Sequence, residues 1–171
     1  GRNDKFSCTE CVLGKYNSLA GQKNESSCKN DCNAGSYIPS DKSSCTTCPQ
    51  GQFQNQDNQP SCDECILGTY NEQTGSTAET ACIDCADGTY TDQTGQASCK
   101  DDCNAGSYIL ADKSACSECV KGQFQDQNDQ SVCKDCVLGQ YSDETKQTAC
   151  KNDCTSGSYI TSDNTSCTFC P

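Results

Sequence analysis

A six-residue pattern, C-x-x-G-x-[YF], recurs nine times in this 171-residue chain and constrains its fold more than any other feature. In every copy a glycine stands three residues after the cysteine and an aromatic residue five after it. A second cysteine follows 13 to 17 residues after the first. Such regularity is the signature of a tandem-repeat protein. The repeats, numbered 1 to 9, are 11–31, 32–47, 48–64, 65–84, 85–102, 103–118, 119–135, 136–153 and 154–169.

The order of the repeats indicates a longer period. Repeats 2, 6 and 9 share the form C-x-x-G-S-Y-I and begin at Cys32, Cys103 and Cys154, with separations of 71 and 51 residues. We infer a three-repeat super-repeat whose first copy has gained repeat 4. Because residues 1–10 and 170–171 are partial repeats, we expect residues 1–171 to be one continuous array within a longer chain.

The composition leaves cysteine as the main source of stability. Val, Ile, Leu and Phe together make up 18 residues, the net charge is -12, and there are 20 cysteines. A chain so poor in large apolar residues cannot offset its conformational entropy without cross-links. Disulfides in this number persist in oxidising compartments, so we expect an extracellular or cell-surface protein that passes through the secretory pathway. The predicted fold class is small and disulfide-rich: an elongated tandem-repeat rod of short β-ribbons and turns, with almost no helix.

The simplest pairing joins the first cysteine of each repeat to the next cysteine along the chain. Closing loops of this size stabilises the fold by about 3 kcal/mol each in the chain-entropy model. Bonds within C-x-x-C, and bonds interleaved between neighbouring repeats, remain as alternatives. Cys8 and Cys170 are then left to pair outside the printed sequence. The predicted disulfides are Cys11–Cys28, Cys32–Cys45, Cys48–Cys62, Cys65–Cys82, Cys85–Cys99, Cys103–Cys116, Cys119–Cys133, Cys136–Cys150 and Cys154–Cys167.

The glycine and the aromatic residue of the pattern have predicted structural roles. A glycine at a constant place indicates a positive φ or a close backbone approach. The aromatic ring is expected to lie over a disulfide, with the tyrosine hydroxyls reaching water. These nine structural aromatics are Tyr16, Tyr37, Phe53, Tyr70, Tyr90, Tyr108, Phe124, Tyr141 and Tyr159.

Several functions are disfavoured by the residues that the chain lacks or holds in excess. Without histidine the chain has no Ser-His or Cys-His pair. Its core is too small to desolvate a carboxylate and shift the pKa of that group. We therefore expect no catalytic residue and no enzyme. The acidic balance opposes binding to nucleic acid and to anionic membranes, and no apolar run could insert into a bilayer. The repeated C-x-x-C pairs also resemble zinc ribbons, but we expect no metal site. Calcium at Asp101-Asp102 or Asp126–Asp129 is a weaker alternative, because neither matches a calcium-binding loop.

Two N-x-[ST] sequons, at Asn24 and Asn164, precede the closing cysteines of repeats 1 and 9. In a secreted protein such sites are glycan acceptors on surface loops, so we expect covalent N-glycans and no other cofactor.

The unit C-x-x-G-x-[YF] followed by C-x-x-C resembles the ephrin-receptor-like cysteine-rich repeat, and it is similar to the first-type module of tumour necrosis factor receptors. In those receptors one disulfide closes each such loop. The long tandem arrangement, rich in Asn, Gln, Ser and Thr, most resembles the immobilisation antigens of ciliates. The resemblance implies a surface protein without enzymatic activity. The four-residue spacings at Cys28–Cys32, Cys99–Cys103 and Cys150–Cys154 depart from the family pattern and leave the inter-repeat angle there open.

We therefore expect a structural extracellular protein, a surface coat or fibre, whose partners are other copies of itself or further repeats of the same chain. The alternative is a receptor or adhesion ectodomain that binds a protein ligand. A binding site needs repeats that differ and exposed aromatic or arginine anchors. Arg2 is the single arginine, and nine of the eleven aromatics occupy the repeat position, which favours the structural role.

Overall fold

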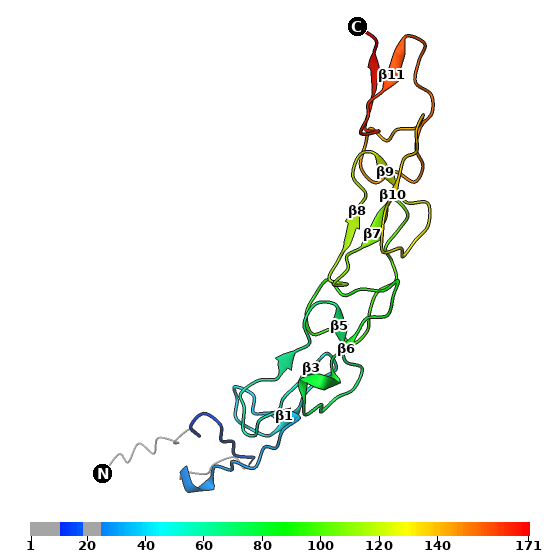
Figure 1. The fold of residues 1–171 in the computed structure, drawn as a ribbon. Coiled ribbons are helices and arrows are strands. Elements are labelled where there is room, and N and C mark those ends of the chain that lie inside the picture. Colours follow the sequence, from blue (N-terminus) through cyan, green and yellow to red (C-terminus); the bar gives the residue numbers. More distant parts are fainter. Residues whose placement is uncertain (1–10, 19–24) are drawn as a thin grey trace, which may run out of the picture. The chain divides into compact units, whose positions relative to one another are not determined.

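The computed structural model describes residues 11–18 and 25–171. Six repeats each contain a two-stranded ribbon, in which the strand with the aromatic residue pairs with the strand at the closing cysteine (Figure 1). The strands are short because only two or three residues separate the glycine turn from the loop. The ribbons are β1 (Ser36–Tyr37) with β2 (Thr46–Thr47), β3 (Gln52–Phe53) with β4 (Asp63–Glu64), β5 (Thr69–Tyr70) with β6 (Ile83–Asp84), β7 (Ser107–Ile109) with β8 (Cys116–Glu118), β9 (Gln123–Phe124) with β10 (Lys134–Asp135), and β11 (Ser158–Ile160) with β12 (Cys167–Phe169).

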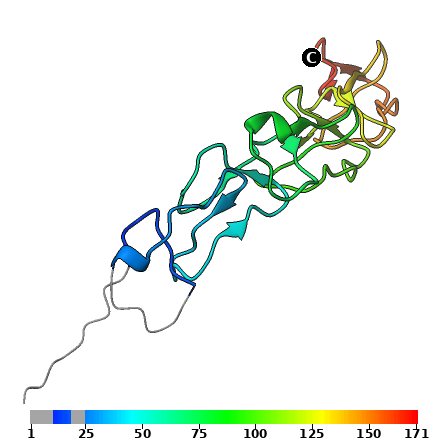
Figure 2. The same ribbon diagram turned by 90° about the horizontal axis from the view of Figure 1, so that it is seen from below.

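The remaining three repeats make the same pairing through one antiparallel bridge each: Tyr16 with Lys29, Tyr90 with Lys100, and Tyr141 with Lys151. In the described part of the chain, helix is limited to two 3-10 turns, η1 (Glu25–Ser27) and η2 (Glu79–Ala81) (Figure 2). The structure thus confirms the predicted small disulfide-rich fold of short ribbons and turns with almost no helix.

Eight disulfides join described cysteines, and each closes one repeat. Their Cα atoms lie 5.5 to 5.8 Å apart, the usual separation for this bond. Every one joins the first cysteine of a repeat to the next cysteine along the chain. Cys8 lies outside the described residues, and Cys170 is exposed and free. The bonds are Cys11–Cys28, Cys48–Cys62, Cys65–Cys82, Cys85–Cys99, Cys103–Cys116, Cys119–Cys133, Cys136–Cys150 and Cys154–Cys167.

Cys32 and Cys45, the pair predicted for repeat 2, have their side chains in contact, although no disulfide joins them in the structure. The ribbon of repeat 2 is one residue pair shorter than those of repeats 6 and 9, and the missing pair is the one that would include Cys45. Pro39 accounts for the shorter ribbon, because proline has no N–H to donate where its counterparts Leu110 and Thr161 donate across the ribbon. The Cys32–Cys45 disulfide stays a prediction.

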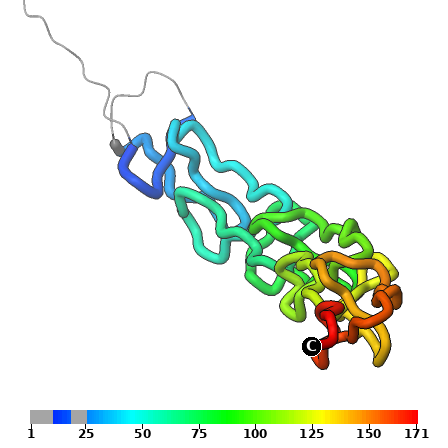
Figure 3. The backbone as a smooth tube through the Cα atoms, turned by 90° about the horizontal axis from the view of Figure 1, so that it is seen from above, coloured from blue at the N-terminus to red at the C-terminus, as the bar shows by residue number. Residues whose placement is uncertain are grey.

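Contacts divide the chain into two compact parts. The first runs to Ile66 and adds residues 70–83 and 94–98. Within it, backbone hydrogen bonds join each repeat to the next, as when the Gly51 amide donates to the Asn71 carbonyl at 2.7 Å and the Gly75 amide to the Cys48 carbonyl at 2.8 Å. The backbone tube passes from one closed loop to the next (Figure 3).

The second part contains residues 67–69, 84–93 and 99–171 and repeats this scheme. The Gly106 amide donates to the Gln125 carbonyl at 2.7 Å, and the Gly122 amide donates to the Ser142 carbonyl at 2.8 Å. The Lys146 amide returns a bond to the Cys119 carbonyl at 2.9 Å. Adjacent repeats are therefore joined through backbone groups.

The core follows the first cysteines of the repeats. Cys32, Cys48, Cys65, Cys85, Cys103 and Cys119 are at most 1% exposed. Two isoleucines after the aromatic residue, Ile38 and Ile109, are also buried. Tyr90, Cys103 and Ile109 form one apolar cluster against Cys116, so this tyrosine packs on the disulfide of the following repeat.

Candidate functional site

The pattern glycine makes a close backbone approach to a loop two repeats further on. Gly106 has φ +87°, and a Cβ atom there would overlap the carbonyl oxygen of Lys146. The same relationship holds between Gly122 and Asp163, where a Cβ would stand 2.8 Å from the carbonyl oxygen. Glycine is therefore required both by conformation and by space.

The loop that meets this glycine contains a second residue with positive φ. In six repeats that residue is not glycine, although a side chain is strained there. Hydrogen bonds to the preceding repeat hold it in place: the Asp129 amide, for example, donates to the Cys103 carbonyl at 2.7 Å. The six residues are Lys42, Asn58, Lys113, Asp129, Lys146 and Asn164.

In repeats 2, 6 and 9 the side chain at this loop position also crosses to the preceding repeat. The Lys42 ammonium donates to the Cys11 carbonyl, and the Lys113 ammonium donates to the Cys85 carbonyl. In repeat 9 the Asn164 amide nitrogen donates to the Cys136 carbonyl at 2.7 Å. Equivalent loops of repeats 2, 6 and 9 are thus each held to the preceding repeat by one side-chain hydrogen bond.

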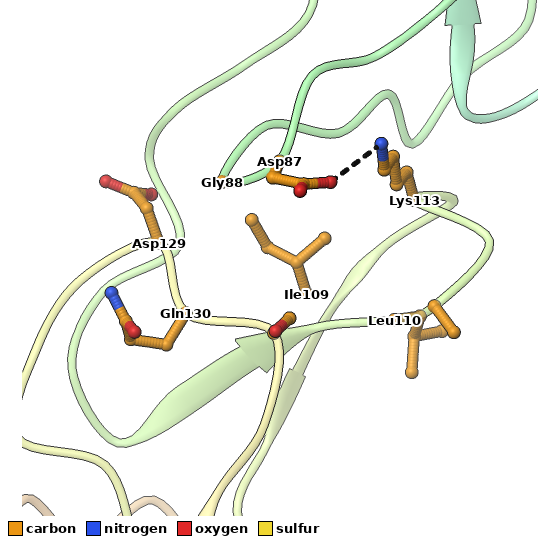
Figure 4. A pocket seen from close by; sticks show the side chains of 9 residues that line it. Asp87, Gly88, Ile109, Leu110, Lys113, Asp129 and Gln130 are labelled. Carbon is orange, nitrogen blue, oxygen red and sulfur yellow. Dashed lines mark ion pairs between the residues drawn. The ribbon is translucent and has the colours of Figure 1, made fainter.

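The loop of repeat 6 forms one side of a recess of about 390 Å³ (Figure 4). Its floor is Ile109, which is 2% exposed, and Leu110 lies beside it. Asp87 of repeat 5 and Asp129 of repeat 7 also line it. Three repeats are therefore needed to build this site.

The polar groups of this recess are already paired within the protein. Lys113 forms an ion pair of 3.2 Å with Asp87, whose side chain is fully exposed. Asp129 accepts a hydrogen bond of 3.0 Å from the Cys103 amide. Such a site can accept a side chain with an apolar body and a polar tip, but it holds no nucleophile and base in contact.

An equivalent recess of about 180 Å³ lies among repeats 1 to 3, with Ile38 in place of Ile109. Leu13 stands where repeat 5 has Asp87, and Pro39 stands where repeat 6 has Leu110. Pro60 replaces Ser131 of the other recess. The position of the site is repeated, but its chemistry changes from acidic to apolar.

The predicted structural aromatics differ in their environments. Phe53, Tyr90 and Tyr141 are buried, whereas Tyr159 is 49% exposed; Tyr16, Tyr37, Tyr70, Tyr108 and Phe124 are partly buried. In the repeats that precede a C-x-x-G-S-Y-I repeat, the tyrosine hydroxyl donates to the aspartate just before the next cysteine. The pairs are Tyr16–Asp31 (2.9 Å), Tyr90–Asp102 (2.7 Å) and Tyr141–Asp153 (2.9 Å).

Sequence reasoning missed the residue that follows the aromatic, which is buried and often polar. Gln125 is 1% exposed; its amide donates to the Val132 carbonyl at 2.6 Å and its oxygen accepts from the Gln127 amide at 3.2 Å. No buried side-chain polar atom of the described residues lacks a hydrogen bond. The sequence marks this residue only by its position, six places after the first cysteine of each repeat. The buried polar members are Gln54, Asn71, Thr91, Gln125 and Ser142.

The two sequons differ in what the structure says of them. Asn24 lies outside the described residues. Asn164 has φ +57° and is partly exposed, and its side-chain amide donates to the Cys136 carbonyl. Elsewhere in the described part of the chain no group of three Cys, Asp or Glu residues is placed to hold a metal ion, and no helix there is long and apolar enough to cross a membrane.

Residues 35–82, from repeat 2 to the closing cysteine of repeat 4, match the family described as tyrosine-protein kinase ephrin type A/B receptor-like. The matched family is a receptor-like cysteine-rich domain and not an enzyme family. No curated protein matches the chain significantly. Together with the disulfides, the family match identifies an extracellular disulfide-rich repeat protein that contains cysteine-rich receptor-like repeats, with residues 35–82 similar to the ephrin-receptor-like domain.

Proposed function

We propose that this protein is a structural component of an extracellular coat or fibre, built from tandem repeats and carrying glycans. The observation that carries the proposal is the recurring set of backbone hydrogen bonds between consecutive repeats. Because these bonds use main-chain groups, the array can extend without specific side chains at each junction. The resemblance to ciliate surface antigens supports the same role.

The surface chemistry suits a hydrated coat. The net charge is -12, and exposed polar loops cover most of the chain, which favours solubility and opposes contact with nucleic acid or anionic lipid. We propose that further repeats of the chain, or other copies of it, are its partners.

Electron microscopy of the native material tests this function. Long threads or layers of uniform width, labelled by antibodies against the chain, are the expected result. Monodisperse particles of one or two chains at native concentration would contradict a coat or fibre.

A receptor or adhesion role is the second candidate, and the two recesses favour it. They share one position but differ in lining, with Asp87 in one and Leu13 in the other, as a surface adapted to a ligand would. Binding of the purified chain to whole cells tests this role. Asp87→Lys should abolish such binding while the control Asp135→Lys, on exposed strand β10, should leave it unchanged. Equal binding by both variants would contradict this candidate.

A further inference from the structure

The pattern glycine can use both of its main-chain groups to join its repeat to the next one. In repeat 6 the Gly106 amide donates to the Gln125 carbonyl at 2.7 Å, and the Gly106 carbonyl accepts from the Cys119 amide at 2.9 Å. Gly122 of repeat 7 makes the same two bonds with repeat 8, at 2.8 Å each. Both groups of such a glycine therefore face the following repeat.

Gly88 of repeat 5 is different, because neither its amide nor its carbonyl makes a hydrogen bond within the described part of the chain. The Cys103 amide, which by analogy with Cys119 would donate to the Gly88 carbonyl, donates to the Asp129 carboxylate at 3.0 Å. Gly88 is partly exposed and lines the recess of repeats 5 to 7. The side chains of this recess are paired, but one main-chain donor and one main-chain acceptor are open to a ligand.

The recess combines these two groups with apolar surface and an acidic side chain (Figure 4). Ile109 and Leu110 supply the apolar surface, and the Asp87 side chain is fully exposed. The volume of about 390 Å³ lies within the range of roughly 300–1,000 Å³ that is usual for ligand sites. A long cationic side chain suits this combination, because its methylene stem can lie on Ile109 while its charged end reaches Asp87.

The charges around the recess favour a cation. Tyr90 packs against the recess floor. Burial and the hydrogen bond to Asp102 raise the pKa of Tyr90, and the charges of nearby aspartates, Asp102 and Asp129 among them, add to this rise. Lys113 divides its ammonium group between Asp87 and a backbone carbonyl. The local potential is therefore negative, in a chain whose net charge is -12.

The recess of repeats 1 to 3 is a matched site without this charge. Gly14 is its equivalent glycine, and it also makes no hydrogen bond with a described residue. Leu13 and Asn58 replace the two aspartates, and the volume is about 180 Å³. Carboxylates and volume, rather than the open main-chain groups, thus distinguish the recess of repeats 5 to 7.

We propose that the recess of repeats 5 to 7 binds an extended peptide segment of a partner protein through a lysine or arginine side chain. The cationic end pairs with Asp87, and the stem covers Ile109. The peptide main chain exchanges hydrogen bonds with the amide and carbonyl of Gly88. This inference rests on the receptor or adhesion role, the second candidate function above, and adds the site and the chemistry of the ligand.

A positional-scanning library of capped tetrapeptides, applied to the intact immobilised chain, tests the chemistry of the ligand. We expect enrichment of lysine and arginine at one position and no enrichment of aspartate or glutamate. Binding should weaken as the ionic strength rises, because an exposed ion pair is screened. Methylation of the amide nitrogen that bonds to Gly88 should weaken binding of the selected peptide about fivefold, the effect of one main-chain hydrogen bond.

NMR of the ¹⁵N-labelled chain tests the place of binding. On titration with the selected peptide, the Gly88 amide resonance should shift and its hydrogen exchange should slow, whereas the Gly14 amide should not change. Asp87→Asn should weaken binding about fivefold, as expected for an exposed ion pair. Asp135→Asn makes the same change in net charge on exposed strand β10 and should leave binding unchanged.

Three results would overturn the proposal: no selection of cationic residues, shifts at Gly14 as large as those at Gly88, or equal affinity of the Asp87→Asn and wild-type chains. Capped lysine alone is the control for the peptide, and binding as tight as that of the tetrapeptide would also overturn it. Whole-cell binding separates this site from the role. If the wild-type chain binds cells but no peptide, the site is wrong and the role stands; if it binds peptides but no cells, the role is wrong.

Discussion

Gly106 of repeat 6 lies against Lys146 of repeat 8, so closely that a methyl group on its Cα would overlap the lysine carbonyl oxygen. A contact between repeats that are two apart thus depends on the absence of a side chain. Gly157 has nearly the same φ, +86°, but nothing lies within 4 Å of the equivalent Cβ position. The two glycines separate the effect of conformation from the effect of contact.

Gly106→Ala should destabilise the fold more than Gly157→Ala. Positive φ costs either alanine about 1–2 kcal/mol, and overlap with Lys146 adds about 1–3 kcal/mol at position 106 alone. Urea unfolding followed by near-ultraviolet circular dichroism of the tyrosines measures the difference. Equal losses would mean that the contact carries no energy.

Lys113→Ala should weaken the junction between repeats 5 and 6 by about 1.5–3 kcal/mol, since it removes a charged hydrogen bond to the Cys85 carbonyl. Lys113→Asn is the matched control, because Asn164 makes the equivalent bond with its amide. Hydrogen exchange of the Thr91 amide, which donates to the Lys113 carbonyl at 3.1 Å, reports on the junction directly. Faster exchange in the asparagine variant than in the alanine variant would contradict this account.

Gln125→Ala should cost about 1–3 kcal/mol, because it leaves the Val132 carbonyl and the Gln127 amide without their partner. The exposed neighbour variant Gln127→Ala should change stability little. Thermal unfolding of both variants measures the contrast. A neutral Gln125→Ala would show that water replaces the lost bonds.

Burial and the hydrogen bond to Asp102 raise the pKa of Tyr90 to about 12. Because the unfolded pKa is about 10, the neutral ring stabilises the fold fully below pH 10, and this contribution disappears as the pH rises through 12. Asp102→Ala should lower the pKa but leave it above 10, since burial remains, and Asp101→Ala should not change it. Titration of ¹³C-labelled tyrosine by NMR tests both variants.

Ser166→Ala should abolish any glycan at Asn164 and leave the amide bond to the Cys136 carbonyl in place. Mass spectrometry before and after glycosidase treatment of the secreted protein shows the loss. An unmodified Asn164 in the wild-type protein would refute glycosylation at this sequon.

Much of this fold could be predicted because the determinants are local. Cysteine spacing indicated the loops, and the constant glycine indicated positive φ, as found at Gly106. The burial of Gln125 and the recess around Ile109 could not be predicted, because both depend on contacts between repeats.

The contact between Gly106 and Lys146 shows how many consecutive repeats depend on one another. Each repeat bonds to the next and also touches the one after it, so three consecutive repeats are the shortest fragment that includes every type of contact. Repeat 4, the inserted repeat, makes the same type of contact: its Gly75 lies against Gly35 of repeat 2, as Lys146 lies against Gly106. Inserting or deleting a whole repeat therefore keeps the same types of contact between neighbours. A deletion that begins or ends inside a repeat breaks that repeat's contacts with the two repeats on either side.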